Sequence, residues 1–127
     1  MSVAAAVASH AEEPRNPAIE AVISQQIDAF KAGDVDTAFS FASPGIQGIF
    51  GSADNFGMMV QGGYPMVWRP GSVSFGALRM VSGGLWQTVI ITDQAGAVHA
   101  LEYQMDPDGA GWEIDGVMFQ RAPQVGA

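Results

Sequence analysis

The chain has 127 residues, 48% of them hydrophobic and 14% charged, a balance that predicts one folded domain and argues against disorder. Its 13 acidic and five basic residues give a formal net charge of −8, and the cations are scattered, which argues against nucleic-acid and anionic-membrane partners. The sequence has no cysteine, which excludes disulfides and thiolate chemistry, and no apolar run near the ~20 residues of a membrane-spanning helix.

Residues 1–15 are expected to form a flexible, alanine-rich N-terminal tail. The opening MSVAAAVASHAEEP lacks the Lys or Arg that begins a signal peptide, although Ser9 and Ala11 have cleavage-like spacing. This interpretation favours the cytoplasm, whereas a start codon placed inside a genuine signal peptide would give a periplasmic protein. The compartment therefore stays open.

The first ordered element is predicted to be a long helix that begins at Pro17. Asn16 can cap it by accepting a hydrogen bond from an early backbone N–H, and proline fits the first helical position. Gly33 is expected to end the helix. One apolar face follows at helical spacing, formed by Ile19, Val22, Ile23, Ile27 and Phe30.

The segment FSFASPGIQGIFG, residues 39–51, is expected to be a corner between two short helices. Pro44 disfavours a helical conformation at the residue before it, so a helix capped by Asp34 and running over 35–42 should end there. Ser43 can then cap a new helical turn that ends at Gly51.

A further short helix is expected to begin at Ser52 or Asp54 and to end at Gly62 and Gly63.

Beyond Tyr64 the pattern becomes alternating, which predicts an antiparallel meander. The letters MVWR at 66–69 suggest a short strand. Longer strands, separated by the turn signals GG, DQAG and DPDGAG, are expected at 73–81, 85–92, 98–105 and 112–119. Helices followed by a meander predict a single α+β domain over 16–121, with the helices on one face of the sheet, and a C-terminal tail at 122–127.

The order of ISQQIDAF, FASPGIQGIFG and YPMVWRP before the meander resembles a bacterial family known only as a domain of unknown function. The match covers roughly residues 17–120, and FASP and Y-x-x-V-x-R-P are its most specific parts. That family looks like a branch of the cystatin-like superfamily of nuclear transport factors, ketosteroid isomerases and SnoaL-like cyclases. The resemblance implies a strongly curved sheet that forms a cone around an apolar cavity, and a homodimer through the sheet. It implies no reaction, because one fold hosts many functions.

Alternation within the strands predicts which side chains face the interior. The expected inner sets are His99, Leu101, Tyr103 and Met105 on one strand, Trp112, Ile114, Gly116 and Met118 on the next, and Val73, Phe75, Ala77, Arg79 and Val81 on the first. Glu102, Glu113 and Asp115 are then expected to face outward. A one-residue shift at a bulge would turn Glu102 and Asp115 inward and favour an enzyme.

His99 and Tyr103 are the candidate catalytic residues. A histidine can act as general acid or base near neutral pH, and a tyrosine hydroxyl can donate to a ligand carbonyl. The alternatives are a hydrogen-bonded core histidine and a packing tyrosine. Arg79 could bind a ligand carboxylate or pair with an acid across the sheet.

The full set of candidate ligand-binding residues is Phe30, Phe41, Phe50, Phe56, Tyr64, Trp68, Arg79, His99 and Tyr103. No metal site is expected, since His10 and His99 cannot assemble one, and no cofactor motif is present.

Three functions remain open from the sequence. The favoured one is a binding or accessory domain whose cavity holds a small apolar or amphipathic molecule. The second is an isomerase, dehydratase or cyclase that uses His99 and Tyr103. The third is a structural dimerisation module whose cavity is filled by its own side chains.

Overall fold

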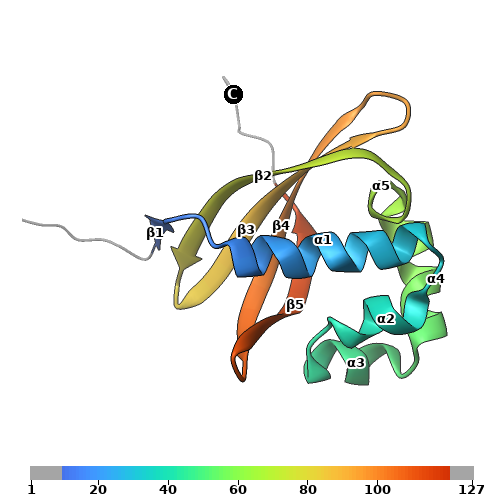
Figure 1. The fold of residues 1–127 in the computed structure, drawn as a ribbon, viewed down its shortest axis with the longest axis horizontal. Helices are drawn as coiled ribbons and strands as arrows, with labels where there is room; N and C mark the ends of the chain where they lie inside the picture. Colours follow the sequence, from blue (N-terminus) through green and yellow to red (C-terminus); the bar gives the residue numbers. More distant parts are fainter. Residues whose placement is uncertain (1–9, 121–127) are drawn as a thin grey trace, which may run out of the picture.

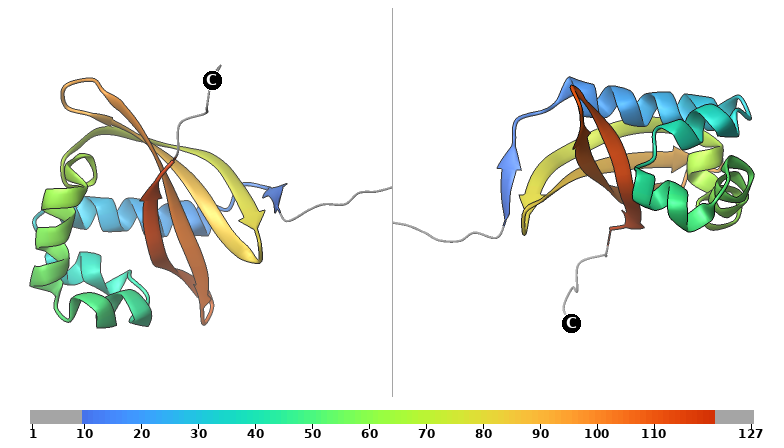
Figure 2. Two further views of the ribbon diagram at one scale, coloured as in Figure 1. Left: turned by 180° about the vertical axis from the view of Figure 1, so that it is seen from behind. Right: turned by 90° about the horizontal axis from the view of Figure 1, so that it is seen from below.

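The computed structural model describes residues 10–120 and shows an α+β fold, as the sequence predicts. The elements in chain order are β1 His10–Glu13, α1 Pro17–Lys31, α2 Val35–Ser40, α3 Pro44–Phe50, α4 Ala53–Gly63, α5 Pro65–Trp68, β2 Pro70–Val81, β3 Gly84–Asp93, β4 Val98–Asp108 and β5 Gly111–Phe119. The strands form one antiparallel sheet in the order β1-β2-β3-β4-β5. Helix α1 lies across one face of this sheet, and α2 to α5 gather beyond its C-terminal end (Figures 1 and 2).

The predicted helix starts are confirmed by their capping hydrogen bonds. Asn16 Oδ1 accepts from Ala18 N at 3.0 Å, and Asp34 Oδ1 accepts from Thr37 N at 3.1 Å. At the predicted corner, Ser43 Oγ accepts from the backbone N–H of Ile46 at 3.2 Å and so begins α3. Ser52 does the same for α4, with Asn55 N at 3.1 Å. Short polar side chains before α1, α2, α3 and α4 thus satisfy donors that each helix leaves free.

The short strand predicted at 66–69 is wrong, because these residues belong to the one-turn helix α5 and its C-cap Arg69. Pro65 occupies the first helical position, and Arg69 N donates to Pro65 O at 3.0 Å. The Arg69 side chain also donates to Phe30 O at 2.9 Å, which ties this turn to α1. Proline at the start of a helix was therefore a better signal here than the β-branched and aromatic residues that follow it.

The N-terminal tail predicted at 1–15 is wrong in part, because His10–Glu13 forms β1 and pairs with the end of β2. Residues 1–9 of that tail, and the C-terminal tail predicted at 122–127, lie outside the described residues. Within residues 10–120, no helix is long and apolar enough to cross a membrane.

A bulge in β2 corrects the face predicted for Arg79. Phe75 pairs with Val89 and Leu78 with Gln87, so Gly76 and Ala77 together oppose Thr88. The extra residue reverses the alternation, which puts Leu78 inside and Arg79 on the opposite, outer face.

A second bulge, in β5, overturns the predicted inner position of Met118. Met105 pairs with Ile114 and Gln104 with Gly116, so Asp115 is the extra residue. After it, Val117 lies on the inner face beside Tyr103, while Met118 is paired with Glu102 on the outer face and is half exposed.

The core lies between the apolar face of α1 and the inner face of the sheet. Ile19 and Ile23 of α1 are completely buried, as are Val89, Ile91 and Leu101 of the sheet. Burial of this much apolar surface is the main contribution to the stability of the fold.

Two glycines of α4 give a matched test of how tightly α4 packs on α2. A Cβ at Gly57 would lie 2.6 Å from Val35 Cγ1, whereas a Cβ at Gly62 would meet nothing within 4 Å. We expect Gly57→Ala to lower the free energy of unfolding by about 1–2 kcal/mol, because overpacking outweighs the better helix propensity of alanine. Gly62→Ala should raise it by about 0.5–1 kcal/mol. Urea unfolding measures both, and a gain at Gly57 would contradict the tight contact.

Candidate functional site

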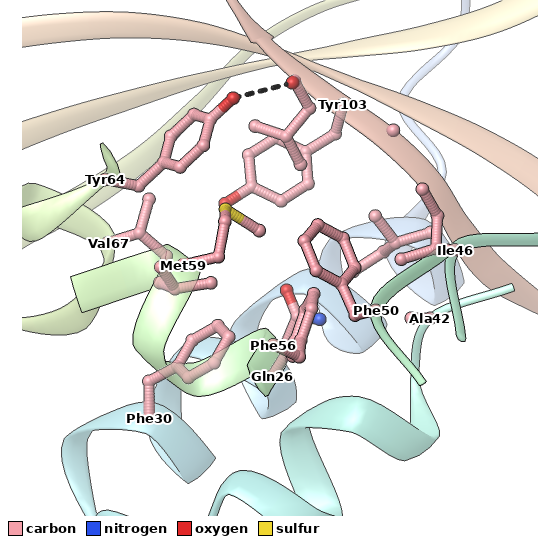
Figure 3. Close-up of a pocket in the computed structure, with 14 residues that line it drawn as sticks. Gln26, Phe30, Ala42, Ile46, Phe50, Phe56, Met59, Tyr64, Val67 and Tyr103 are labelled. Atoms are coloured by element: carbon pink, nitrogen blue, oxygen red, sulfur yellow. Dashed lines mark hydrogen bonds between the residues drawn. The ribbon is translucent and has the colours of Figure 1, made fainter. Parts of the chain in front are cut away.

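A cavity of about 230 Å³ lies between the helices and the β4–β5 end of the sheet (Figure 3). Its walls come from α1, the corner between α2 and α3, α3, α4, the α4–α5 junction, α5, β4 and β5. The 14 lining residues are Gln26, Phe30, Ala42, Ile46, Phe50, Phe56, Met59, Val60, Tyr64, Val67, Tyr103, Ile114, Gly116 and Val117. No Asp, Glu, His, Lys or Arg is among them, so the wall is uncharged and almost entirely apolar.

The helix corner is attached to the outer edge of β5. Ser43 N donates to Ile114 O and Ile114 N donates to Phe41 O, both at 2.9 Å, so the corner pairs with the strand like a short parallel neighbour. Ser43 Oγ also donates to Asp115 at 2.6 Å. These contacts fix α3 over the cavity, and with it Ile46 and Phe50.

A second attachment joins the α4–α5 junction to the same strand. The Tyr64 hydroxyl donates to Val117 O at 3.1 Å, the bond that is dashed in Figure 3. The Tyr64 ring stacks on Phe119, with centroids 5.1 Å apart and planes 10° from parallel. The half-buried lining residues Ile46, Phe50 and Met59 belong to α3 and α4, which connect the two attachments, so we place the mouth of the cavity there.

Aromatic rings form one wall of the cavity. Phe56 is the centre of the group, 5.8 Å from Phe30, 5.4 Å from Phe39 and 5.6 Å from Phe50 between ring centroids. These distances are typical of favourable aromatic pairs. Phe30, Phe50 and Phe56 line the cavity, whereas Phe39 supports Phe56 from outside the lining.

Two of the polar side chains that line the cavity, Gln26 and Tyr103, are buried. Gln26 donates from Nε2 to Ala38 O at 3.1 Å, and its amide oxygen is turned toward the cavity in Figure 3. Tyr103 is 1% exposed, and its ring projects into the cavity from β4. Burial, with a smaller effect of Tyr64, raises the pKa of the Tyr103 phenol well above its usual 10.0. The phenol is thus neutral and keeps its proton.

The structure brings five of the nine predicted ligand-binding residues together at the cavity, namely Phe30, Phe50, Phe56, Tyr64 and Tyr103. Phe41 is at the corner, where its carbonyl accepts from Ile114, and does not line the space. Trp68 packs on the Phe30 ring at 5.6 Å and lies under the Arg69 guanidinium, 5.0 Å from its ring centroid. Neither side chain reaches the cavity.

His99 and Arg79 are also away from the cavity. His99 shares the inner face with Tyr103, but its Nε2 lies 2.9 Å from Asp93 Oδ2, beside the β3–β4 turn. That hydrogen bond, with backbone donors from Ala97 and Ala95, holds the pKa of Asp93 below its usual value. Arg79 pairs with Glu102 at 2.8 Å on the outer face, so the predicted inward position of Arg79 is wrong.

The sequence interpretation missed several lining residues, and Gln26 is the most informative. It lies three and seven positions after Ile23 and Ile19, on the buried stripe of α1, where a polar residue is unusual. A polar residue on that stripe was a usable signal in the sequence for a residue that lines the cavity. Gly116 was predicted to face inward and does line the cavity. Val117 could not be found in this way, because the bulge at Asp115 changes which residues face inward.

The outer face holds a separate polar cluster around Glu102, which is 6% exposed. Its carboxylate accepts from Arg79 at 2.8 Å, from Thr88 Oγ1 at 2.9 Å and from Gln120 Nε2 at 2.7 Å. The sequence correctly predicts that Glu102 faces outward. Across residues 10–120, no group of three His, Asp or Glu residues is arranged to hold a metal ion.

Comparison with known proteins gives one match. The family model described as "Domain of unknown function (DUF4864)" matches residues 12–127. No curated protein and no solved structure matches the chain.

Proposed function

The chain belongs to the family of domains of unknown function called DUF4864, and we propose that this member binds a small, uncharged, largely apolar molecule in the cavity under α3 and α4. The observation that carries the proposal is a cavity of about 230 Å³ whose lining contains no charged side chain. Ligand sites are concave and mostly apolar, with a few polar groups that fix orientation.

The size of the cavity limits the ligand. An engineered cavity of about 150 Å³ holds benzene, so this one has room for about nine non-hydrogen atoms. A charged ligand would lose its water without gaining a counter-charge, which is strongly unfavourable. A compact neutral compound is the best fit.

Binding is better supported than catalysis. The enzyme alternative requires His99 to act with Tyr103, yet His99 does not line the cavity and is paired with Asp93. Tyr103 has no general base beside it, because the lining offers no carboxylate or imidazole. The structural alternative requires a filled interior, and the aromatic wall leaves space.

The kinship to the cystatin-like superfamily, its cone-shaped sheet and a homodimer through the sheet stay proposals. The order of the elements, a long helix and short helices before an antiparallel meander, supports the first two. The homodimer rests on the resemblance alone.

The proposal is tested with α-methylstyrene, a neutral hydrocarbon of the expected size. We expect the protein to bind it, and Val60→Phe to weaken binding at least tenfold, because the larger ring occupies part of the cavity that Val60 lines. Saturation-transfer NMR and the shift of the melting temperature measure binding, and circular dichroism checks that the variant is folded.

The matched control is the same substitution at Val98, which is 67% exposed and away from the cavity. Val98→Phe should bind α-methylstyrene as the unmodified protein does. A failure of the unmodified protein to bind the hydrocarbon, or equal binding by a folded Val60→Phe, would contradict the proposal.

A further inference from the structure

The Tyr103 hydroxyl is a buried donor without an acceptor. Within residues 10–120, only two buried side-chain polar atoms have no hydrogen-bond partner, Tyr103 Oη and Gln87 Oε1. Gln87 uses its amide N–H groups on Gly76 O and Thr88 O and does not line the cavity. Native proteins pair the great majority of such atoms. An unpaired hydroxyl on Tyr103, a residue that lines the cavity, therefore points to an occupant.

The other tyrosine of the lining is already satisfied. Tyr64 donates to Val117 O. Gln26 donates to Ala38 O, and its amide oxygen, which is turned toward the cavity, can only accept. Tyr103 alone offers an uncommitted O–H, and the rise in its pKa keeps the proton on the oxygen. It can therefore act as a hydrogen-bond donor at any physiological pH.

We propose that the ligand carries one uncharged acceptor oxygen, such as that of a ketone, aldehyde, ester or amide, and that this oxygen accepts the hydrogen bond of the Tyr103 hydroxyl. The inference rests on the proposed binding function and adds the chemical class of the ligand. The apolar part of the ligand lies against the aromatic wall of Phe30, Phe50 and Phe56.

The Tyr103 hydroxyl oxygen is itself buried, so a ligand oxygen reaches it only after a lining side chain moves. Met59 lines the cavity nearer the solvent and is the one unbranched, flexible apolar side chain of the lining. Such a side chain changes rotamer readily and can move aside to admit the oxygen. The fixed parts of the site are then Tyr103 on β4 and the aromatic wall.

The test compares two probes of nearly the same shape, acetophenone and α-methylstyrene, in which a carbonyl oxygen replaces a methylene group. For each probe the dissociation constant is measured with the unmodified protein and with Tyr103→Phe, which keeps the ring and removes the donor. We expect the preference for acetophenone over α-methylstyrene to fall about fivefold to tenfold in the variant, the effect of one net hydrogen bond.

The outcomes separate the inference from the proposed function. Suppose that the hydrocarbon binds and that Tyr103→Phe weakens the binding of both probes equally, or of neither probe. The acceptor inference is then overturned, while the binding function stands. If neither probe binds the unmodified protein, both fall. Benzoate, a charged probe of similar size, should bind at least tenfold more weakly than acetophenone, and tighter binding of benzoate would refute the uncharged class.

Discussion

Phe30→Ala is expected to lower the free energy of unfolding by about 3–5 kcal/mol, the largest stability effect that we predict for a single residue. Phe30 is 1% exposed, and its ring lies 5.8 Å from Phe56 and 5.6 Å from Trp68. Removing the ring takes away buried apolar area and leaves a void. Because Phe30 already borders a cavity of about 230 Å³, the void would merge with existing space.

Urea denaturation of the unmodified and variant proteins measures this loss, provided that the dependence of the unfolding free energy on urea is unchanged. The control is Ile49→Ala on α3, because Ile49 is 74% exposed and should change stability by no more than about 0.5 kcal/mol. Similar losses at the two positions would mean that Phe30 is not part of the core.

The second large effect is expected at Glu102, on the outer face. Glu102→Ala leaves Arg79, Thr88 and Gln120 without their shared acceptor. Breaking a buried ion pair typically costs about 3–5 kcal/mol. The Arg79 side chain is 34% exposed and regains water, so we discount the loss to about 2–3 kcal/mol.

Urea denaturation again measures the change, and Glu12→Ala is the control. Glu12 is an exposed glutamate of β1 opposite Arg79, and its removal should cost less than about 0.5 kcal/mol. Binding of α-methylstyrene to folded Glu102→Ala should be unchanged, because Glu102 faces away from the cavity. Loss of binding in that variant would contradict the separation of the two faces.

The sequence predicts well those parts of the fold that local chemistry determines. Asn16, Asp34, Ser43 and Ser52 each accept a hydrogen bond from a backbone N–H in the first turn of their helix, which requires only the residues next to them. The turns between the four long strands are set by local signals in the same way.

The faces of the strands depend on pairing between distant segments and were harder to predict. The bulge at Gly76 and Ala77 reverses the side on which Arg79 lies, although simple alternation predicts an inward side chain. The available signal in the sequence was Gly76, since a glycine within a strand often marks such a bulge. In the structure, a Cβ at this position would lie only 3.1 Å from Thr88 Cγ2 across the strands.

The candidate site was predictable to the extent that it is aromatic. Phe30, Phe50 and Phe56 follow from helical spacing, and Tyr103 from alternation in β4. That the Tyr103 hydroxyl lacks a partner could not be read from the sequence, because it depends on which groups of α4 and β5 approach it in three dimensions.

The attachments of the helices to β5 have a consequence for association between molecules. An unpaired strand edge offers backbone groups to which another chain can add, and this is a common route to aggregation. On β5, both backbone groups of Ile114 are engaged by the helix corner, and Val117 O is engaged by Tyr64. The contacts that frame the cavity mouth therefore also occupy backbone groups at the edge of the sheet to which another strand could otherwise pair.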